Sequence, residues 1–362
     1  MTQAPRIVHL VPALFGPKGV VGGAERYALE LARHMAEQVP TTLVSFGDEA
    51  REETMGALRI RVVDRAHAVR GNRLNPVSLK AVPELWRADI IHCHQRAVLS
   101  SSLAALFARA TGKKAFTTDL GGGGWDFSAY VNTDRWFHGH LHLSEYSRQV
   151  HGHEGKPWAH VIYGGVDTER FSPDASVARD GSVVFVGRLL PHKGVADLID
   201  ALPDGMRLEL YGPPMNEAYL ATLKQLSQDK QVTFHHGAPD AELVQAYRRA
   251  LCVVLPSVYT TRDGATTKVP ELLGQTPLEG MACETPAVVT DVASLPEVVA
   301  DGETGFVAKP NDPPSLAEKL RWLRDHPKEA RQMGEAGRRR VLSRFTWAAV
   351  VERCLEIYGV AR

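Results

Sequence analysis

Short apolar runs, separated by longer amphipathic segments, recur along the chain, and this alternation restricts the fold more than any other feature. The first series of runs is Ile7–Val11, Thr42–Ser45, Ile60–Val63, Asp89–Cys93, Ala115–Thr118, His140–Leu143 and His160–Tyr163. A second series is Ser182–Gly187, Arg207–Tyr211, Gln231–His235, Cys252–Leu255, Pro286–Thr290 and Gly305–Val307. Strands that alternate with helical crossovers predict a parallel, doubly wound α/β sheet. Two series predict two such domains in tandem.

The length of the chain agrees with two domains, because 362 residues exceed what a single hydrophobic core usually supports. Between the two series, Tyr163–Ala175 combines glycine, proline and charge without periodicity. Such a segment is typical of a connection, so we expect the domain junction there. After Ser315 the pattern is helical, as in Leu316–Asp325 and Pro327–Phe345.

The charge of the chain is balanced, with 42 basic and 42 acidic side chains. No global field therefore favours nucleic acid or a charged membrane as partner. The N-terminus enters the run Ile7–Val11 without signal-peptide architecture, and no stretch approaches the ~18 apolar residues of a membrane span. We expect a cytoplasmic protein whose membrane contact, at the inner face, is at most peripheral.

The four cysteines are widely spaced and lie in apolar surroundings. They form no C-x-x-C pair and no cluster with histidine, so we predict buried thiols in a reducing compartment. They are Cys93, Cys252, Cys283 and Cys354.

A glycine-rich loop follows the first apolar run and precedes a helix expected from about Ala24. Gly22 and Gly23 close this loop, where backbone amides and the helix N-terminus could hold a phosphate. The spacing matches neither the Rossmann fingerprint nor the P-loop, so a plain turn is the simpler interpretation.

Two cations follow the first strand of the second series. Arg188 comes directly after Gly187, and Lys193 lies five positions further on. The carboxyl edge of an open α/β sheet is where ligands bind, and a guanidinium with an ammonium suits a diphosphate. The alternative is a pair of solvated side chains.

Two glutamates eight positions apart, Glu271 and Glu279, flank the start of another expected helix. Their carboxylates could bind a polyhydroxylated ligand. The alternative is structural, because Thr276-Pro277-Leu278-Glu279 fits a capping box with Thr276 as N-cap. Glu271 would then gain only from the helix dipole, about 0.3–1 kcal/mol.

The first domain has its own candidate side chains at strand ends. His92 and His94 share one side of a strand by period 2, but no further ligand has suitable spacing for zinc. We therefore expect His94 to line a cleft. Asp119 follows the next strand, and Gly121–Gly124 after it form either an acceptor-site lid or a flexible connection.

Taken together in this order, these motifs resemble the retaining glycosyltransferases of family 4, and the resemblance covers essentially the whole chain. The residues that carry it, besides Glu271, Glu279 and Gly274 between them, are Gly22-Gly23-Ala24-Glu25, Gly165-Val166-Asp167, Phe171, Pro173, Gly187-Arg188, Lys193-Gly194, Pro256-Ser257, Cys283, Thr285-Pro286, Pro296-Glu297 and Asp301-Gly302-Glu303-Thr304-Gly305-Phe306.

The resemblance implies the GT-B fold, with two Rossmann-like doubly wound domains that face a central cleft. Residues 1–165 would form the acceptor-side domain, completed by a C-terminal helix in 346–362. Residues 166–345 would form the domain that binds the nucleotide-sugar donor.

The resemblance also implies roles for individual residues. Arg188 and Lys193 would hold the donor diphosphate, helped by amides after Gly22, Gly23 and Gly274. Glu271 would contact the transferred sugar and Glu279 the nucleotide ribose, with Gln275 and Thr276 beside them. Stabilisation of the leaving group by these donors is electrostatic catalysis, so no metal and no cofactor is implied.

Some positions depart from the family pattern. Asp119 stands where the family often has a histidine, and aspartate would instead accept from a hydroxyl or act as a base toward the acceptor. The connection before Glu271 is about a dozen residues longer than usual, a length at which loops tend to be functional. We place its Tyr259, Arg262, Asp263 and Lys268 near the donor sugar or acceptor. Glu284 occupies a usual glycine position, so its turn either has positive φ or differs.

The resemblance thus implies a metal-independent, retaining glycosyltransferase of the hexosyltransferase type. It would move a sugar from a nucleotide-diphosphate sugar to a hydroxyl on a sugar, a lipid-linked or a small-molecule acceptor. The catalytic set would be Asp119, Arg188, Lys193 and Glu271, with His94, Gly121, Gly122, Tyr259 and Arg262 as candidate acceptor-side residues. Two alternatives stay open: a sugar-nucleotide epimerase, and a non-catalytic partner subunit that binds the nucleotide sugar.

Overall fold

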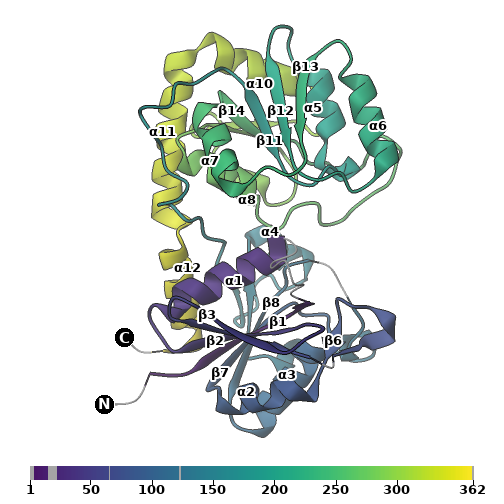
Figure 1. The fold of residues 1–362 in the computed structure, drawn as a ribbon, viewed down its shortest axis with the longest axis vertical. Helices are drawn as coiled ribbons and strands as arrows, with labels where there is room; N and C mark the ends of the chain where they lie inside the picture. Colours follow the sequence, from purple (N-terminus) through teal and green to yellow (C-terminus); the bar gives the residue numbers. More distant parts are fainter. Residues whose placement is uncertain (1–3, 15–22, 65, 122–123, 361–362) are drawn as a thin grey trace. The chain divides into compact units, whose positions relative to one another are not determined.

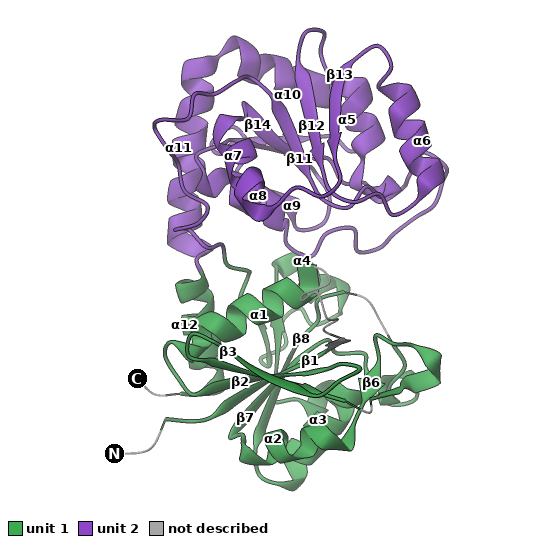
Figure 2. Cartoon of the chain, viewed as in Figure 1, with its two compact units in different colours: residues 1–165, 347–362 green, residues 166–346 purple. Residues whose placement is uncertain are grey.

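The computed structural model describes residues 4–14, 23–64, 66–121 and 124–360. These residues form two compact units, drawn in different colours in Figure 2. Unit 1 comprises Met1–Gly165 with Trp347–Arg362, and unit 2 comprises Val166–Thr346. Within the described ranges, no helix combines the length and the apolar character that a membrane span requires.

Unit 1 is built on one eight-stranded sheet of order β10-β9-β8-β7-β1-β2-β4-β3. Neighbouring strands are parallel except for the antiparallel pair β3 and β4. The strands are β1 Ile7–Leu14, β2 Thr41–Phe46, β3 Arg51–Met55, β4 Leu58–Val63, β7 Ile90–His94, β8 Lys114–Thr118, β9 Gly139–His142 and β10 Ala159–Val161. The helices are α1 Gly23–Ala36, α2 Val82–Arg87, α3 Leu99–Ala110, α4 Glu145–Val150 and α12 Trp347–Tyr358.

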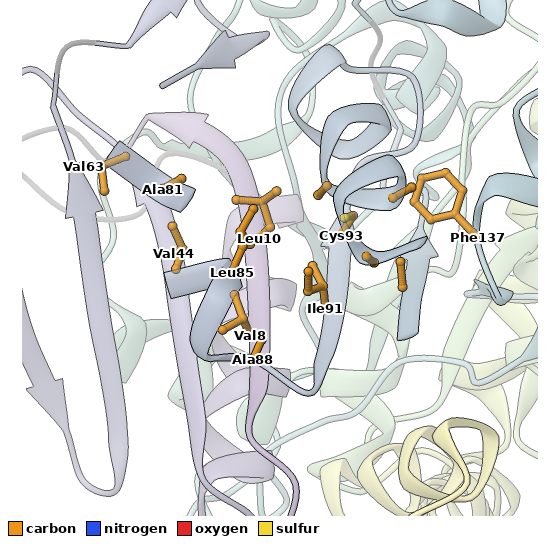
Figure 3. Packing of buried hydrophobic residues seen from close by; sticks show 14 of the residues in the cluster. Val8, Leu10, Val44, Val63, Ala81, Leu85, Ala88, Ile91, Cys93 and Phe137 are labelled. Carbon is orange, nitrogen blue, oxygen red and sulfur yellow. The ribbon is translucent and has the colours of Figure 1, made fainter. Parts of the chain in front are cut away.

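The period-2 alternation of the strands in unit 1 creates two core layers. Val8 and Leu10 of β1 face α2 and α3, together with Ile91 and Cys93 of β7 (Figure 3). Val11 of β1 faces the opposite side and packs with residues of α1. Figure 1 shows α1 on one side of the sheet and α2 and α3 on the other. The sheet is therefore covered on both faces, as expected for parallel strands.

Short elements complete unit 1. A two-stranded antiparallel sheet joins β5 His67–Ala68 to β6 Pro76–Val77. Four 3₁₀ turns lie at η1 Val69–Gly71, η2 Leu79–Ala81, η3 Phe127–Ala129 and η4 Asp134–Trp136.

Unit 2 holds a six-stranded, all-parallel sheet of order β13-β12-β11-β14-β15-β16. Its strands are β11 Val183–Val186, β12 Arg207–Tyr211, β13 Gln231–His235, β14 Cys252–Leu255, β15 Ala287–Thr290 and β16 Gly305–Ala308. Its helices are η5 Pro191–Lys193, α5 Val195–Ala201, α6 Glu217–Leu226, α7 Asp240–Arg249, α8 Gln275–Ala282, α9 Leu295–Val298, α10 Pro313–Asp325 and α11 Pro327–Arg344.

In each sheet, the chain adds strands first in one direction and then in the other, with one point of reversal. In unit 2 the chain runs outward from β11 to β13 and then returns to place β14 on the other side of β11. In unit 1 the same reversal separates β1 from β7. Loops that leave the carboxyl ends of the strands diverge at such a point and leave room for a ligand. The predicted fold class of two doubly wound parallel sheets is confirmed.

The sequence pattern missed β3. Its residues are R-E-E-T-M, and four of the five are exposed because β3 is an edge strand. Glu52 of β3 pairs with Arg59 and Arg61 of β4, so ion pairs replace the apolar alternation that marks a buried strand.

Two expectations about individual positions are confirmed. All four cysteines are free and buried. Glu284, directly after the α8 C-cap, has φ of 61°, so the first of the two alternatives for this turn holds. Left-handed backbone at a non-glycine residue costs of order 1 kcal/mol. Arg179 donates to the carbonyl oxygen of Glu284, which helps to hold the turn.

Candidate active site

The switch point of unit 2 brings together two loops that are far apart in the sequence. The loop after β11 leads to Gly194, and the loop after β14 begins at Pro256. A Cβ on Gly194 would lie 1.9 Å from the carbonyl oxygen of Pro256, and Gly194 has φ of 68°. Only glycine fits this approach and this backbone conformation. The loop of Lys193 is thereby held against the loop of Ser257.

Lys193 and Glu271 form an ion pair at this switch point. The Lys193 Nζ donates to Glu271 Oε1, and the Ser257 hydroxyl donates to the same oxygen at 2.7 Å. The side chains of Lys193 and Glu271 are only 14% and 10% exposed. Among the described residues, Glu271 Oε2 has no hydrogen-bond donor. The pair therefore presents a fixed carboxylate oxygen beside an ammonium group.

Arg188 adds positive charge beside Lys193, and the imidazole of His192 lies near both cations. Arg188 is exposed and forms no ion pair with any described residue. The pKa of His192 is lowered, first by burial and then by the nearby charges of Lys193 and Arg188. His192 was missed in the sequence, although its place next to Lys193 in the motif P-H-K-G was visible. These side chains suit an anion.

Helix α8 begins at Gly274, which has φ of 87° and ψ of 59°. The predicted capping box is therefore wrong: Gly274 is the N-cap and Thr276 lies within the first turn. The Thr276 hydroxyl donates instead to the carbonyl oxygen of Val186 at 3.0 Å, which ties α8 to the end of β11. Glu279 is half-buried, and the Tyr247 hydroxyl donates to its Oε2 at 3.0 Å. The amides of Gln275 and Thr276 lie in the helix's first turn, at the positive end of the helix dipole, which attracts an anion.

The long loop before Glu271 is an ordered hairpin. Thr260 pairs with Thr266, and the Thr267 amide donates to the carbonyl oxygen of Tyr259 at 2.8 Å. The Tyr259 hydroxyl accepts from the amide of Ala293 at 2.8 Å. This contact anchors the hairpin on the loop before α9.

Arg262 of the hairpin is bound by two carboxylates. Its guanidinium donates to Asp197 at 2.7 Å and to Asp200 at 2.6 Å, both on α5. Arg262 and Asp197 line a pocket of about 300 Å³ with Asn216 and Tyr219. The guanidinium that we placed near the donor sugar or acceptor is thus neutralised by α5, a partner that local sequence could not indicate.

Unit 1 has a smaller pocket, of about 70 Å³, at its own switch point. His94 lines it, as predicted, with Gln95, Glu25 and Gly121. Gln95 has φ of 128°, a strained conformation for a residue with a side chain, and its side-chain Nε2 donates to the carbonyl oxygen of Gly121 at 2.7 Å. Strain of this kind is common at functional sites. Gly23 begins α1 near this pocket, whereas Gly22 and Gly122 lie outside the described residues.

Asp119 forms a pair with His151, a residue that no sequence motif singled out. Asp119 Oδ1 accepts from the Gly121 amide at 3.0 Å, and Oδ2 lies 3.3 Å from His151 Nε2. His151 Nδ1 lies 2.6 Å from the carbonyl oxygen of Ser147. Both partners of the ring are acceptors, so both ring nitrogens must donate, which is the doubly protonated form. The Asp119 hydrogen bond accordingly raises the pKa of His151, against the opposing effect of burial.

A network of neutral histidines lies behind the unit 1 pocket. His9 of β1 joins the predicted pair His92 and His94, and His9 Nδ1 lies 2.7 Å from His94 Nε2. His92 bonds Thr118 at 2.8 Å and Tyr358 at 2.6 Å. Burial lowers the pKa of His9 to about 3 and holds those of His92 and His94 well below their usual range. The three imidazoles are therefore uncharged at neutral pH.

Two groups of described side chains are close enough to hold a metal ion, with ligand atoms within 4.8 Å of one another. The first is the trio His9, His92 and His94, whose nitrogens are largely committed to the hydrogen bonds just described. The second is Asp134, His140 and His153. In that group the Arg96 guanidinium already binds Asp134 Oδ1, so a cation of the protein occupies the carboxylate.

Sequence profiles match both units. A profile described as Glycosyltransferase Family 4 matches residues 21–170, and one described as Glycosyl transferases group 1 matches residues 167–340. The two matches overlap only at residues 167–170 and together cover most of the chain. The chain belongs to this family of glycosyltransferases and has the GT-B fold.

Curated relatives agree with this assignment. The chain is 35% identical to the alpha-maltose-1-phosphate synthase of Mycolicibacterium smegmatis over 55% of this chain and 56% of the relative. It is 32% identical to the glycogen synthase of Mycobacterium tuberculosis over 56% of this chain and 48% of that protein. The matched segments thus span about half of these relatives. The putative glycosyltransferase EpsD of Bacillus subtilis is 28% identical over 78% of this chain and 79% of the relative.

Solved structures share the fold along nearly the whole chain. Sucrose-phosphate synthase from Thermosynechococcus elongatus superposes with a TM-score of 0.75 at 19% identity, covering 98% of both chains. The Anabaena protein HepE in complex with UDP-glucose gives a TM-score of 0.73 at 17% identity, covering 99% of this chain and 100% of that one. At this identity the likeness establishes the fold.

Proposed function

We propose that this protein transfers a sugar, with retention of configuration, from a nucleotide-diphosphate sugar to a hydroxyl acceptor. The observation that carries the proposal is the ion pair of Lys193 and Glu271 at the unit 2 switch point, with exposed Arg188 beside it. Cations for a diphosphate and a carboxylate for sugar hydroxyls are thereby placed within one small region.

The donor diphosphate binds Arg188, Lys193 and the amides at the start of α8. Arg188 offers a planar fork and is free of ion pairs with described residues, so no internal bond has to be broken. The first-turn amides after Gly274 add partial positive charge. Glu279 accepts from the ribose hydroxyls, and the Tyr247 bond to Oε2 fixes the orientation of its carboxylate.

The transferred sugar is oriented by Glu271. Ser257 and Lys193 hold Oε1, which leaves Oε2 to accept from sugar hydroxyls. A carboxylate held on one oxygen cannot rotate freely, so the sugar is bound in one orientation. Lys193 thus has two tasks, since it binds the phosphate and positions Glu271.

The chemical step breaks the bond between the anomeric carbon and the diphosphate oxygen. The leaving diphosphate keeps the electron pair, and Arg188, Lys193 and the α8 amides stabilise its charge. The acceptor oxygen bonds the anomeric carbon from the same face, and its proton passes to an oxygen of the leaving phosphate. This route needs neither a protein nucleophile nor a metal ion.

The acceptor hydroxyl is positioned by unit 1. The pocket lined by His94, Gln95 and Gly121 provides polar groups. The Asp119–His151 pair holds Gly121, where the second loop rich in glycine begins. A carboxylate oxygen has two lone pairs, so Asp119 can still accept from an acceptor hydroxyl while it keeps both present bonds.

A two-stage assay tests this proposal. Thermal-shift measurements with a panel of nucleotide sugars, starting with UDP-glucose because HepE was solved with it, should identify a donor that raises Tm. Release of nucleoside diphosphate is then measured with sugar, lipid-linked and small-molecule acceptors, and the product anomer is assigned by NMR. Acceptor-dependent release with retained configuration is expected.

Other outcomes separate the alternatives. Donor binding without release in the presence of any acceptor would favour a non-catalytic partner subunit. Conversion of the donor sugar without transfer would show an epimerase. The Glu271→Gln variant serves as the negative control, since it should bind nucleoside diphosphate yet lose transfer.

A further inference from the structure

A row of large apolar side chains is exposed on the outer side of η2 and α2. Leu79 is 85% exposed, Val82 38% and Trp86 63%. Their spacing of three and four residues places them on one side of a helical segment. The opposite side of the same segment is used for packing, because Ala81 and Leu85 are buried in the core below. The exposed row therefore does not serve the fold of unit 1.

Helix α3 extends this row. Leu103 and Leu106 are 40% and 38% exposed, whereas Ala104, Ala105 and Ala108 of the same helix are buried in the core that holds Leu85. The Trp86 and Phe107 rings are in contact, with centroids 5.8 Å apart. Figure 1 shows α2 and α3 on the same side of the sheet. These residues make up an outer surface of the two helices, which we call the α2–α3 face. Its members are Leu79, Val82, Trp86, Leu103, Leu106 and Phe107.

The charge around the α2–α3 face is strongly positive, although the whole chain is neutral. Residues 64–114 contain nine Lys and Arg against three acids, an excess of six positive charges. Each of the three acids is paired: Asp64 with Lys80 at 2.6 Å, Glu84 with Arg59 and Arg87, and Asp89 with Arg6. Beside the α2–α3 face, the side chains of Lys80 and Arg87 are 45% and 60% exposed.

We propose that the α2–α3 face docks on an anionic lipid bilayer. Apolar side chains on one side of a surface helix, with a tryptophan and flanking cations, match an interfacial membrane contact. The apolar residues would enter the boundary between headgroups and acyl chains. Lys80, Arg87 and Arg109 would lie among the phosphates.

The charge argues against a second copy of this chain as the occupant. Self-association through the α2–α3 face would bring two surfaces of the same sign together, which costs free energy when charges are desolvated. An anionic bilayer supplies the opposite sign. The proposal does not depend on the proposed glycosyl transfer, because vesicle binding is measured without donor or acceptor.

Vesicle flotation with the full chain tests the proposal. The protein should float with vesicles that contain about 30% phosphatidylglycerol in phosphatidylcholine and remain unbound with pure phosphatidylcholine. Binding should weaken with salt, since the screening length falls from about 10 Å at 0.1 M to about 3 Å at 1 M. Salt-independent binding to both vesicles alike, or binding to neither, would overturn the proposal.

Two double variants locate the contact. Leu79→Ser with Trp86→Ser should reduce the partition coefficient by about tenfold or more. Lys80→Gln with Arg87→Gln should reduce it by a similar factor, because each cation near an anionic surface contributes roughly fivefold. The matched controls lie in unit 2: Met215→Ser, at a side chain 54% exposed, and Lys328→Gln with Arg331→Gln on α11. The controls should bind as the parent does.

Folding and self-association are checked separately. Circular dichroism should be unchanged in all variants, because the substituted side chains are exposed. Light scattering should give the same mass for the parent and the Leu79→Ser, Trp86→Ser variant. A parent dimer that this variant dissociates would assign the α2–α3 face to self-association and overturn the membrane proposal, as would variants that float like the parent.

Discussion

Lys193 and Glu271, 78 positions apart in the sequence, form a largely buried ion pair that also takes the hydroxyl of Ser257. The pair joins the loop after β11 to the loop after β14. The pair therefore couples the residue proposed to bind phosphate, Lys193, to the residue proposed to bind the sugar, Glu271. A substitution of one should affect the other.

The substitution Lys193→Met should lower transfer by about 10²-fold or more, because a donor to the leaving group is lost. It also leaves Glu271 without its cation, which should lower the free energy of unfolding by about 1–3 kcal/mol. Steady-state kinetics and urea unfolding measure the two effects. Lys328→Met, on the exposed surface of α11, is the control and should change neither quantity. Parent-like turnover in Lys193→Met would remove Lys193 from the catalytic set.

The substitution Glu279→Ala should weaken binding of the nucleoside diphosphate by about tenfold or more, as expected for loss of a hydrogen bond to a charged group. Tyr247→Phe should weaken it less, because only the orientation of the Glu279 carboxylate is lost. Calorimetric titration checks both. The N-cap of α8 is Gly274, so Glu279→Ala removes no capping box. Unchanged affinity with a lowered Tm would show that Glu279 is structural.

The Asp119–His151 pair should weaken as the pH rises. The pKa of His151 is raised in the folded state above its ordinary value of 6.5, so its contribution to stability is fully present below pH 6.5. The contribution is lost as the pH rises through the folded-state pKa. In the Asp119→Asn variant this loss should disappear. Chemical-shift titration of the His151 ring in the parent, with unfolding measured across the same pH range in both proteins, provides the test. A His151 that titrates at or below 6.5 contradicts the pairing.

The buried histidines should destabilise the protein in acid. Burial lowers the pKa of His9 to about 3 and that of His140 to about 4, so the unfolded chain binds protons that the folded chain does not. Stability is therefore present above pH 6.5 and falls as the pH drops below it, by up to about 1.4 kcal/mol per pH unit for each such group. Urea unfolding between neutral and mildly acid pH should show this slope. His140→Gln should make this slope shallower, because one of the contributing groups is removed.

The hairpin before Glu271 should detach when Arg262 is replaced. Arg262→Ala removes both bonds to α5, and because the guanidinium is 43% exposed the expected cost is only about 0.5–1 kcal/mol. Limited proteolysis should then cut near Gly264 faster than in the parent, while donor affinity stays unchanged. A large loss of donor affinity would show instead that Arg262 contributes to the donor site, as the sequence predicts.

The sequence alone determined the two sheets and much of the donor side. Buried parallel strands are continuous apolar runs, so they can be recognised in the sequence without knowledge of the neighbouring strands. Arg188 and Asp119 could be placed for the same reason. Each follows a predicted strand, and residues that follow parallel strands lie at the carboxyl edge of the sheet. The family resemblance then supplied the roles of Glu271 and Glu279, which local chemistry left open between ligand binding and helix capping.

Only the tertiary structure decided which side chains meet. His151 reaches Asp119 across 32 positions, and His9 comes from another strand to join His92 and His94. The start of α8 at Gly274 depends on a left-handed residue, and the binding of Arg262 depends on where α5 lies. Local propensity and periodicity are properties of neighbours in the chain. Ion pairs, shared protons and the exposure of the α2–α3 face arise from packing between distant segments, which no local pattern encodes.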